Sequence, residues 1–269
     1  MNNPTYVTDL TDRQWQIIKD LLPSPRAGGR PRTVCLRGAF NAMLYLLTTG
    51  CQWKMLPQSY PHWRTVYGYF RAWQHDGTWE RLHHRLRRWA RRQARRKERP
   101  TAASIDSQSI KSTCVSGVRG YEAFNEAFKR VMGRKRHIVV DTLGLVLAVC
   151  ITPANVSDTA GAVQILPLQI LPLLQRCAHR LQLIWCDGGY FETAFEQATQ
   201  QGLKLQAVLR PAGQKGFSLL AKRWVVERTF AWLSRCRRLD REYEVTIESS
   251  RAFLFLAMSK LMIARLAPT

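Results

Sequence analysis

The sequence is poor in acidic residues, has no paired cysteines and contains no long uninterrupted apolar run. Only 19 Asp and Glu stand against 41 Lys and Arg among its 269 residues, so the formal net charge is +22. The 7 cysteines form no Cys-x-x-Cys pair, which argues against a disulfide framework or a structural zinc site and favours a reducing compartment. Because the first ten residues lack the features of a signal peptide, we expect a cytoplasmic protein.

One segment, residues 252–267, is apolar enough to be compared with a membrane span. Lys260 and Arg265 interrupt it, and the apolar run before Lys260 is far shorter than the ~20 residues that a spanning helix needs. We therefore predict a C-terminal helix that packs in a core rather than one with a membrane role.

The excess of positive charge predicts a polyanionic partner, either nucleic acid or an anionic membrane surface. With 46% hydrophobic residues the chain can bury a core, so we do not expect global disorder. Residues 1–100 carry a net charge of +13 and residues 101–269 a net charge of +9. Because helical patterns precede Pro100 and strand patterns follow it, we expect one domain at 1–100 and a second at 101–269.

The first domain has apolar residues at helical spacing, and two of its expected helices, at 36–48 and 62–75, have the order of a helix-turn-helix. The segment between them is long for that motif. The second helix would present Arg64 and Arg71 to a DNA major groove while its aromatic residues pack inward. The alternative is a helical bundle whose aromatic residues all belong to a core.

Two basic stretches could contact a polyanion. Residues 81–99 contain ten Lys or Arg and one acidic residue, and Arg91, Arg92 and Arg95 are expected to contact DNA phosphates, which supply affinity more than specificity. A solvated basic helix face is the other interpretation. Residues 133–137, with Lys135 at the centre, predict either a contact with the DNA backbone or a solvated strand end.

The second domain alternates between strand and helix patterns, which predicts an α/β fold with a mixed sheet. A Leu-Gly turn joins two strands in a hairpin. The expected strands lie at 102–106, 137–141, 145–152, 181–187 and 205–209, and the expected helices at 158–174, 191–200 and 222–238.

Three acidic residues stand at positions suited to chemistry. Asp106 and Asp187 each follow a short buried strand, and ligands bind at the open edges of α/β sheets. Glu227 shares a helix face with Trp224 and Ala231, and a carboxylate beside a packed face is costly unless it is paired or metal-bound. Each acid alone could be a cap or a surface ion pair, but together they supply the oxygen ligands of an Mg²⁺ or Mn²⁺ pair for phosphoryl transfer.

Four blocks of the second domain read IDSQSIKST, GRKRHIVVDTLGLVLAV, WCDGGYFE and RWVVERTFAWLSRCRRLDREYE. They resemble, in order, the catalytic blocks of DDE transposases from small bacterial insertion sequences, specifically the IS-five family. In the first domain, LTDRQWQIIKDLLP, GGRPR, GCQWKMLP and YGYFRAW resemble the helical DNA-binding region of that family. The resemblance covers nearly the whole chain.

The resemblance implies a ribonuclease-H-like catalytic domain at 101–269, preceded by an all-α, helix-turn-helix-like DNA-binding domain at 1–100. It also implies that Asp106, Asp187 and Glu227 are the catalytic residues and the ligands of two divalent ions, Mg²⁺ or Mn²⁺.

The family signature around the third acid places Tyr, Arg, Glu and Lys at fixed spacing. Arg223 and Glu227 match it, whereas Leu220 stands at the Tyr position and Ser234 at the Lys position, followed by Arg235. Arg223 and Arg235 are expected to contact DNA, and the roles of the two departing residues stay open.

The function that the resemblance implies is DNA transposition. Such a transposase binds the terminal inverted repeats of its insertion sequence, cleaves the ends of the element and transfers the freed 3′-OH to target DNA. Its partner would be double-stranded DNA, and no membrane would be involved. A homodimer or larger assembly would hold two DNA ends. The protein would act in the bacterial cytoplasm, at the nucleoid. Two alternatives are a nuclease that cuts without strand transfer and a DNA-binding protein in which the acids no longer assemble.

Overall fold

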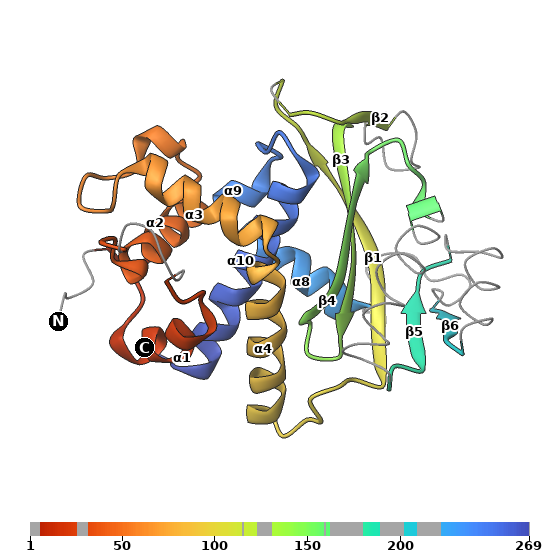
Figure 1. Cartoon of the computed structure of the whole chain (residues 1–269). Helices are drawn as coiled ribbons and strands as arrows, with labels where there is room; N and C mark the ends of the chain where they lie inside the picture. The colour runs from red at the N-terminus through yellow and green to blue at the C-terminus, as the bar shows by residue number, and fades with distance from the viewer. Residues whose placement is uncertain are drawn as a thin grey trace. The chain divides into compact units, whose positions relative to one another are not determined.

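The structure, a computed structural model, describes residues 6–25, 32–114, 116–122, 131–158, 160–161, 180–188, 202–208 and 222–268 (Figure 1). The chain forms two compact units, of which unit 1 consists of Met1–Arg96, Leu233–Asp240 and Glu248–Thr269, and unit 2 of Lys97–Trp232 and Arg241–Ile247. The chain therefore returns to unit 1 twice, whereas the predicted division placed everything after residue 100 in one domain.

Unit 1 is helical, as predicted for the first hundred residues. Its elements are α1 (Asp12–Ile18), η1 (Lys19–Leu21), α2 (Leu36–Thr49), η2 (Trp53–Met55), α3 (Trp63–His75), α4 (Thr78–Gln93), α9 (Arg237–Asp240) and α10 (Ile247–Leu266). Thr11 begins α1 with a capping box, because the Thr11 hydroxyl accepts from the Gln14 amide while the Gln14 side chain accepts from the Thr11 amide. Gly50, at φ +73°, ends α2 in the left-handed conformation. Between α2 and α3 the chain forms η2 instead of the short turn of a simple helix-turn-helix.

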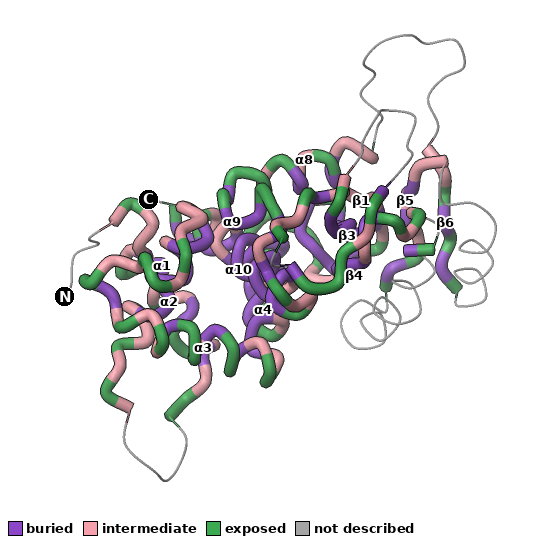
Figure 2. Tube along the Cα trace, turned by 90° about the horizontal axis from the view of Figure 1, so that it is seen from above, coloured by how far each residue is buried: buried purple, intermediate pink, exposed green. Residues whose placement is uncertain are grey.

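An aromatic cluster fills the core of unit 1. Phe70 of α3 stacks on Phe253 of α10 with ring centroids 4.5 Å apart, and Trp73 meets Trp79 edge-on at 5.3 Å. α10 is buried along most of its length (Figure 2), which confirms the predicted core-packing C-terminal helix. Among the residues that the structure describes, no helix combines the length and apolar character needed to cross a membrane.

Unit 2 is built on a mixed sheet of β1 (Ala102–Lys111), β2 (Gly120–Glu122), β3 (Val131–Asp141), β4 (Val146–Pro153), β5 (Leu183–Cys186) and β6 (Lys204–Ala207). β3 pairs antiparallel with β1, β2 and β4, whereas β1, β5 and β6 pair in parallel. The order β4-β3-β1-β5-β6, with only β3 reversed, is that of a ribonuclease-H-like sheet, so the predicted α/β fold is confirmed. The helices predicted at 158–174 and 191–200 lie outside the described residues, apart from the start of the first.

The helix predicted at 222–238 is found as α8 (Trp224–Ser234) followed by α9, and α8 docks on the turn between β3 and β4. The Thr229 hydroxyl donates to the Gly144 carbonyl at 2.9 Å, and Arg228 Nη2 donates to the Leu143 carbonyl at 3.1 Å. Gly144 has φ +80°, and a Cβ on it would lie 2.8 Å from the Trp232 ring. The helix can approach the turn this closely because residue 144 has no side chain.

Replacing Gly144 with alanine should destabilise unit 2. The added methyl group would strain a left-handed residue and press on Trp232, so we expect the free energy of unfolding to fall by roughly 2–4 kcal/mol in urea denaturation. Gly202→Ala is the matched control, because Gly202 has φ +73° but no atom within 4 Å of the added Cβ. An equal loss in both variants would mean that the contact with Trp232 contributes nothing.

Candidate active site

Asp106 and Asp187 are brought together by the way β1 pairs with β5. The last pair of the parallel register joins Ser104 with Trp185. Asp106 comes two residues after Ser104, and Asp187 comes two residues after Trp185. Both acids therefore lie just beyond the last paired positions. The prediction that Asp106 ends its strand is wrong. β1 continues past Asp106 to Lys111, because it stays paired with β3 on its other side.

Arg223 lies between the two aspartates. Its Nη2 atom is 3.8 Å from Asp106 Oδ2 and 3.6 Å from Asp187 Oδ2, and its side chain is only 15% exposed. The chain just ahead of Arg223 is tied to β1, because Ser104 Oγ donates to the Lys222 carbonyl at 2.8 Å. One guanidinium therefore faces carboxylates from two strands.

The surroundings of Asp106 disfavour its ionised form. Burial raises the pKa of Asp106 to about 7, and the negative charges of Asp187 and Asp158 add to the rise. The Ser107 backbone N–H, which donates to Asp106 Oδ1 at 2.8 Å, and the Arg223 guanidinium oppose it. A further cation near Asp106 would favour the ionised carboxylate.

Glu227 is not grouped with the two aspartates. Its side chain is exposed on α8, whereas Val226, Thr229 and Phe230 form the buried side of the helix. The prediction that Glu227 shares a packed face with Trp224 and Ala231 is therefore wrong, because the apolar side chains that α8 buries lie on another side of the helix. Within the described ranges, no three His, Cys, Asp or Glu side chains are placed to hold a metal ion together.

Asp106 and Asp187 supply two of the carboxylate ligands that a divalent cation would need. Their Oδ2 atoms approach one common point, the position of Arg223 Nη2. Carboxylate oxygens are the ligands that Mg²⁺ and Mn²⁺ prefer, and the unfavourable ionisation of Asp106 is the electrostatic condition that a bound cation would relieve.

The basic run at the start of β3 is buried and does not face a ligand. Lys135 Nζ lies 3.0 Å from Glu122 Oε1 and 3.1 Å from Asp158 Oδ1, and the arginines on either side of it both pair with Glu242. The structure therefore contradicts the prediction that Lys135 contacts DNA, because two carboxylates neutralise its charge inside unit 2.

The predicted recognition helix has the expected faces. Arg64 and Arg71 are exposed on α3, and the buried side chains of the helix are Val66, Phe70 and Trp73. Lys54 and Arg64 both lie over the Trp63 ring, at 6.0 and 5.4 Å from its centroid. Spacing alone does not reveal this grouping, because Lys54 comes from η2.

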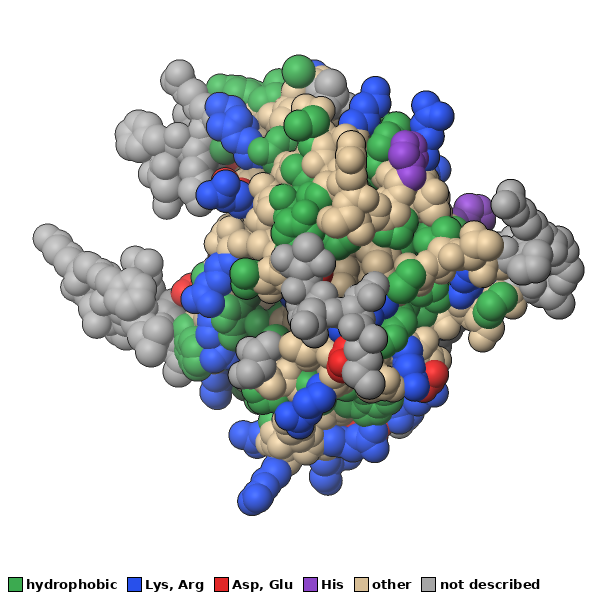
Figure 3. All heavy atoms as spheres, turned by 90° about the vertical axis from the view of Figure 1, so that its left-hand side faces the viewer, with side chains coloured by type: hydrophobic (Ala, Val, Ile, Leu, Met, Phe, Trp, Pro, Cys, Tyr) green, Lys and Arg blue, Asp and Glu red, His purple; other side chains and the backbone are tan. Residues whose placement is uncertain are grey.

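The other predicted DNA contacts differ in exposure. Arg92, Arg95 and Arg235 are exposed, but Arg91 is only 4% exposed, so the structure does not present Arg91 to a ligand. Lys and Arg side chains are spread over the face seen in Figure 3, on which few Asp and Glu side chains appear.

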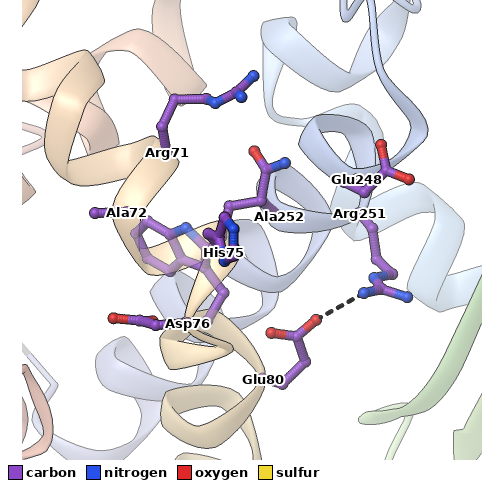
Figure 4. A pocket seen from close by; sticks show the side chains of 10 residues that line it. Arg71, Ala72, His75, Asp76, Glu80, Glu248, Arg251 and Ala252 are labelled. Atoms are coloured by element: carbon purple, nitrogen blue, oxygen red, sulfur yellow. Dashed lines mark hydrogen bonds and ion pairs between the residues drawn. The ribbon is translucent and has the colours of Figure 1, made fainter.

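Unit 1 also contains a pocket of about 640 Å³ beside α3, α4 and α10 (Figure 4). Arg251 of α10 pairs with Glu80 of α4 at 3.1 Å within it. Its lining mixes acidic and basic side chains and includes none of the three predicted catalytic acids. We therefore do not treat it as the active site.

Two family models match the chain. One, described as a transposase DDE domain, matches residues 97–262, and one for transposases of the IS4/5 family (DUF4096) matches residues 10–83. The first match covers more than half of the chain and includes Asp106, Asp187 and Glu227.

Two curated relatives belong to insertion element IS402 of Burkholderia cepacia. A protein described as its transposase is 36% identical over 129 residues, 46% of this chain, so that the match spans 60% of the relative's length. An uncharacterised 16.2 kDa protein of the element is 32% identical over 115 residues, which cover 38% of this chain and 73% of the relative. The solved Mos1 mariner paired-end complex with Mn is 13% identical, with 95% of this chain and 84% of that chain covered, at a TM-score of 0.34.

The pKa of Asp106 predicts that Asp106→Asn stabilises the protein at high pH. Because the folded-state pKa of about 7 exceeds the ordinary 3.8, the folded protein binds the proton more tightly and loses stability as pH rises from about 4 to 7. Asparagine has no proton to lose, so urea denaturation in EDTA should show a gain on the order of 2 kcal/mol at pH 8 that shrinks toward pH 4. The exposed Glu227→Gln serves as the control, and a gain independent of pH would contradict the assignment.

Proposed function

This chain belongs to the DDE transposase family, and we propose that it binds the terminal inverted repeats of an insertion sequence, cleaves the ends of the element and transfers the 3′-OH to target DNA. The observation that carries the proposal is the pairing of β1 with β5, which sets Asp106 beside Asp187 on a ribonuclease-H-like sheet. Arg223 between them supports the view that this point of the sheet is built for a cation.

Asp106 and Asp187 would hold the divalent ions, and Glu227 would be the third ligand. Glu227 lies in the first turn of α8, which begins directly after Arg223, and this closeness in the chain supports its assignment to the same site. Two Mg²⁺ or Mn²⁺ ions would supply activation of the attacking oxygen and stabilisation of the leaving oxygen. Arg223, relieved of neutralising both aspartates, would then be available to a DNA phosphate.

DNA would be bound through unit 1. Arg64 and Arg71 on the exposed face of α3 are suited to a major groove, with Lys54 beside them at Trp63. Arg92 and Arg95 would contact phosphates, and Arg235 would bind close to α8. Phosphate contacts fix the position of the protein on the duplex, whereas contacts with base edges select the sequence.

The protein would act on two DNA ends at once, and we propose a homodimer or larger assembly for that purpose. One active site processes one end at a time, so joining both ends of an element to one target requires at least two copies. We place this activity in the bacterial cytoplasm at the nucleoid, where the DNA substrates lie.

Asp106→Asn and Asp187→Asn should each abolish cleavage of inverted-repeat DNA. Removing one carboxylate from a two-ion site removes ligands for the catalytic charge, so we expect losses of at least ~10³-fold in the rate of Mg²⁺-dependent cleavage. Glu227→Gln should have the same effect, and the exposed Asp240→Asn should cleave normally. The assay uses labelled duplexes carrying the repeats that flank the gene, with precut ends to score strand transfer. Full cleavage by Asp106→Asn or by Asp187→Asn would refute the site. If the unaltered protein cleaves DNA but does not transfer precut ends, it is a nuclease.

Arg64→Ala and Arg71→Ala should weaken DNA binding in a way that depends on their contacts. If the arginine contacts a base, its removal should cost about 1–3 kcal/mol of binding free energy on the inverted repeat and little on random DNA. If it contacts a phosphate, its removal should weaken binding to both DNAs and lower the slope of log affinity against log salt by about one. Fluorescence anisotropy over a range of salt concentrations would measure this, with the exposed Arg13→Ala as the control. If all three variants bind alike, α3 does not face the DNA.

A further inference from the structure

A series of polar contacts beneath the candidate active site ends at Asp106. Ser107 Oγ donates to Asp158 Oδ1 at 2.6 Å, and Lys135 Nζ lies 3.1 Å from the same oxygen. Lys135 is held from its other side by Glu122 at 3.0 Å. The backbone N–H of Ser107 then donates to Asp106 Oδ1 at 2.8 Å. The contacts therefore join β2, β3, β1 and the segment after β4 to one oxygen of Asp106.

These residues lie on the face of the sheet opposite to Asp106. Ser107 is paired with His137 and Ser109 with Lys135, and paired residues in an antiparallel ladder point to the same side. Because side chains alternate along a strand, the Asp106 side chain points to the other side. Among the residues that the structure describes, the hydrogen bond from the Ser107 backbone N–H links this network to the carboxylate.

The segment after β4 is fixed against this face at two points. Asp158 binds Ser107 and Lys135, and three residues later the backbone of Gly161 touches the buried His137 ring, where a Cβ would lie 2.0 Å from His137 Cε1. Asp158 and Gly161 therefore both contact this face of the sheet.

The charged side chains of this network are largely buried. The Lys135 and Glu122 side chains are 5% and 8% exposed, and Asp158 is 28% exposed. A buried ion pair is stable only when each charge keeps its partner, because removing one leaves the other uncompensated. The network is therefore held in one arrangement and can fix the position of Ser107.

We propose that Ser107, Asp158 and Lys135 are positioning residues that orient the Asp106 carboxylate. By holding the Ser107 amide against Oδ1, they leave Oδ2, the atom that approaches Arg223 and lies on the side of Asp187, free to bind a cation. The inference rests on the proposed function, since the orientation matters only if Asp106 is a metal ligand. Outer-shell hydrogen bonds of this kind commonly tune metal affinity.

Ser107→Ala, Ser107→Thr and Ser109→Ala test this role. Ser107→Ala removes the hydroxyl that binds Asp158 but keeps the backbone N–H, whereas Ser107→Thr restores the hydroxyl. Ser109→Ala is the matched control, because Ser109 lies on the same face of β1, is half-buried and makes no side-chain hydrogen bond to any residue described. All proteins are first compared by thermal unfolding, and only those within a few degrees of the parent are analysed further.

Two readouts are measured on the full chain without DNA: Mn²⁺ affinity by electron paramagnetic resonance, and hydrogen exchange of the residue-107 amide by NMR in EDTA. We expect Ser107→Ala to weaken Mn²⁺ binding roughly tenfold and to accelerate amide exchange, with both values restored in Ser107→Thr and unchanged in Ser109→Ala. The rate of Mg²⁺-dependent cleavage should follow the Mn²⁺ affinity.

The inference is overturned if Ser107→Ala matches Ser109→Ala in either readout, since the network would then not hold the amide or the amide would not orient the ligand. Failure of the proposed function looks different. In that case the unaltered protein neither binds Mn²⁺ nor cleaves DNA. The proposal that the network positions a metal ligand then fails together with the proposed function. Amide exchange still reports whether the network holds the Ser107 backbone.

Discussion

Strand β1 determines where chemistry can occur in this protein, because its two sides are paired to different extents. Antiparallel pairing with β3 runs from Ala103 to Lys111, whereas parallel pairing with β5 covers only Ala102 to Ser104. The strand therefore remains hydrogen-bonded on one side after it has lost its neighbour on the other. Asp106 lies at this point, so its backbone is held in the sheet while its carboxylate faces an edge that can admit a ligand.

The Lys and Arg side chains of the chain occupy two different environments. The run at the start of β3 is buried, and its three cations pair with Glu122, Asp158 and Glu242 within unit 2. The cations of α3 are exposed and lie on the side of the helix away from its buried residues. Net charge predicts the kind of partner, but burial decides which cations can reach it.

Sequence patterns predicted five of the six strands of the sheet that the structure describes, because a short run of apolar and β-branched residues is a local signal. They failed where the deciding partner is distant in the chain. The buried side of α8 packs on the turn between β3 and β4, which lies about 85 residues earlier in the chain, so the spacing within the helix did not reveal that Glu227 is exposed. Lys135 was interpreted as a DNA contact because Glu122 and Asp158, which neutralise it, become neighbours only when the sheet forms. Ser107 gave no signal at all, since its partner Asp158 lies 51 residues away in the chain.

The two faces of β1 carry similar charge arrangements with opposite consequences. On one face Lys135 joins Glu122 and Asp158 at 3.0 and 3.1 Å, distances at which charge-assisted hydrogen bonds form. On the other face Arg223 joins Asp106 and Asp187 at 3.8 and 3.6 Å, which gives Coulomb attraction without such bonds. Arg223 thus lies farther from its two carboxylates than Lys135 does, and the longer pairing falls where burial already disfavours the charge on Asp106. A divalent cation at that position would offset the negative charge of the two aspartates, whereas on the opposite face Lys135 already forms two close ion pairs.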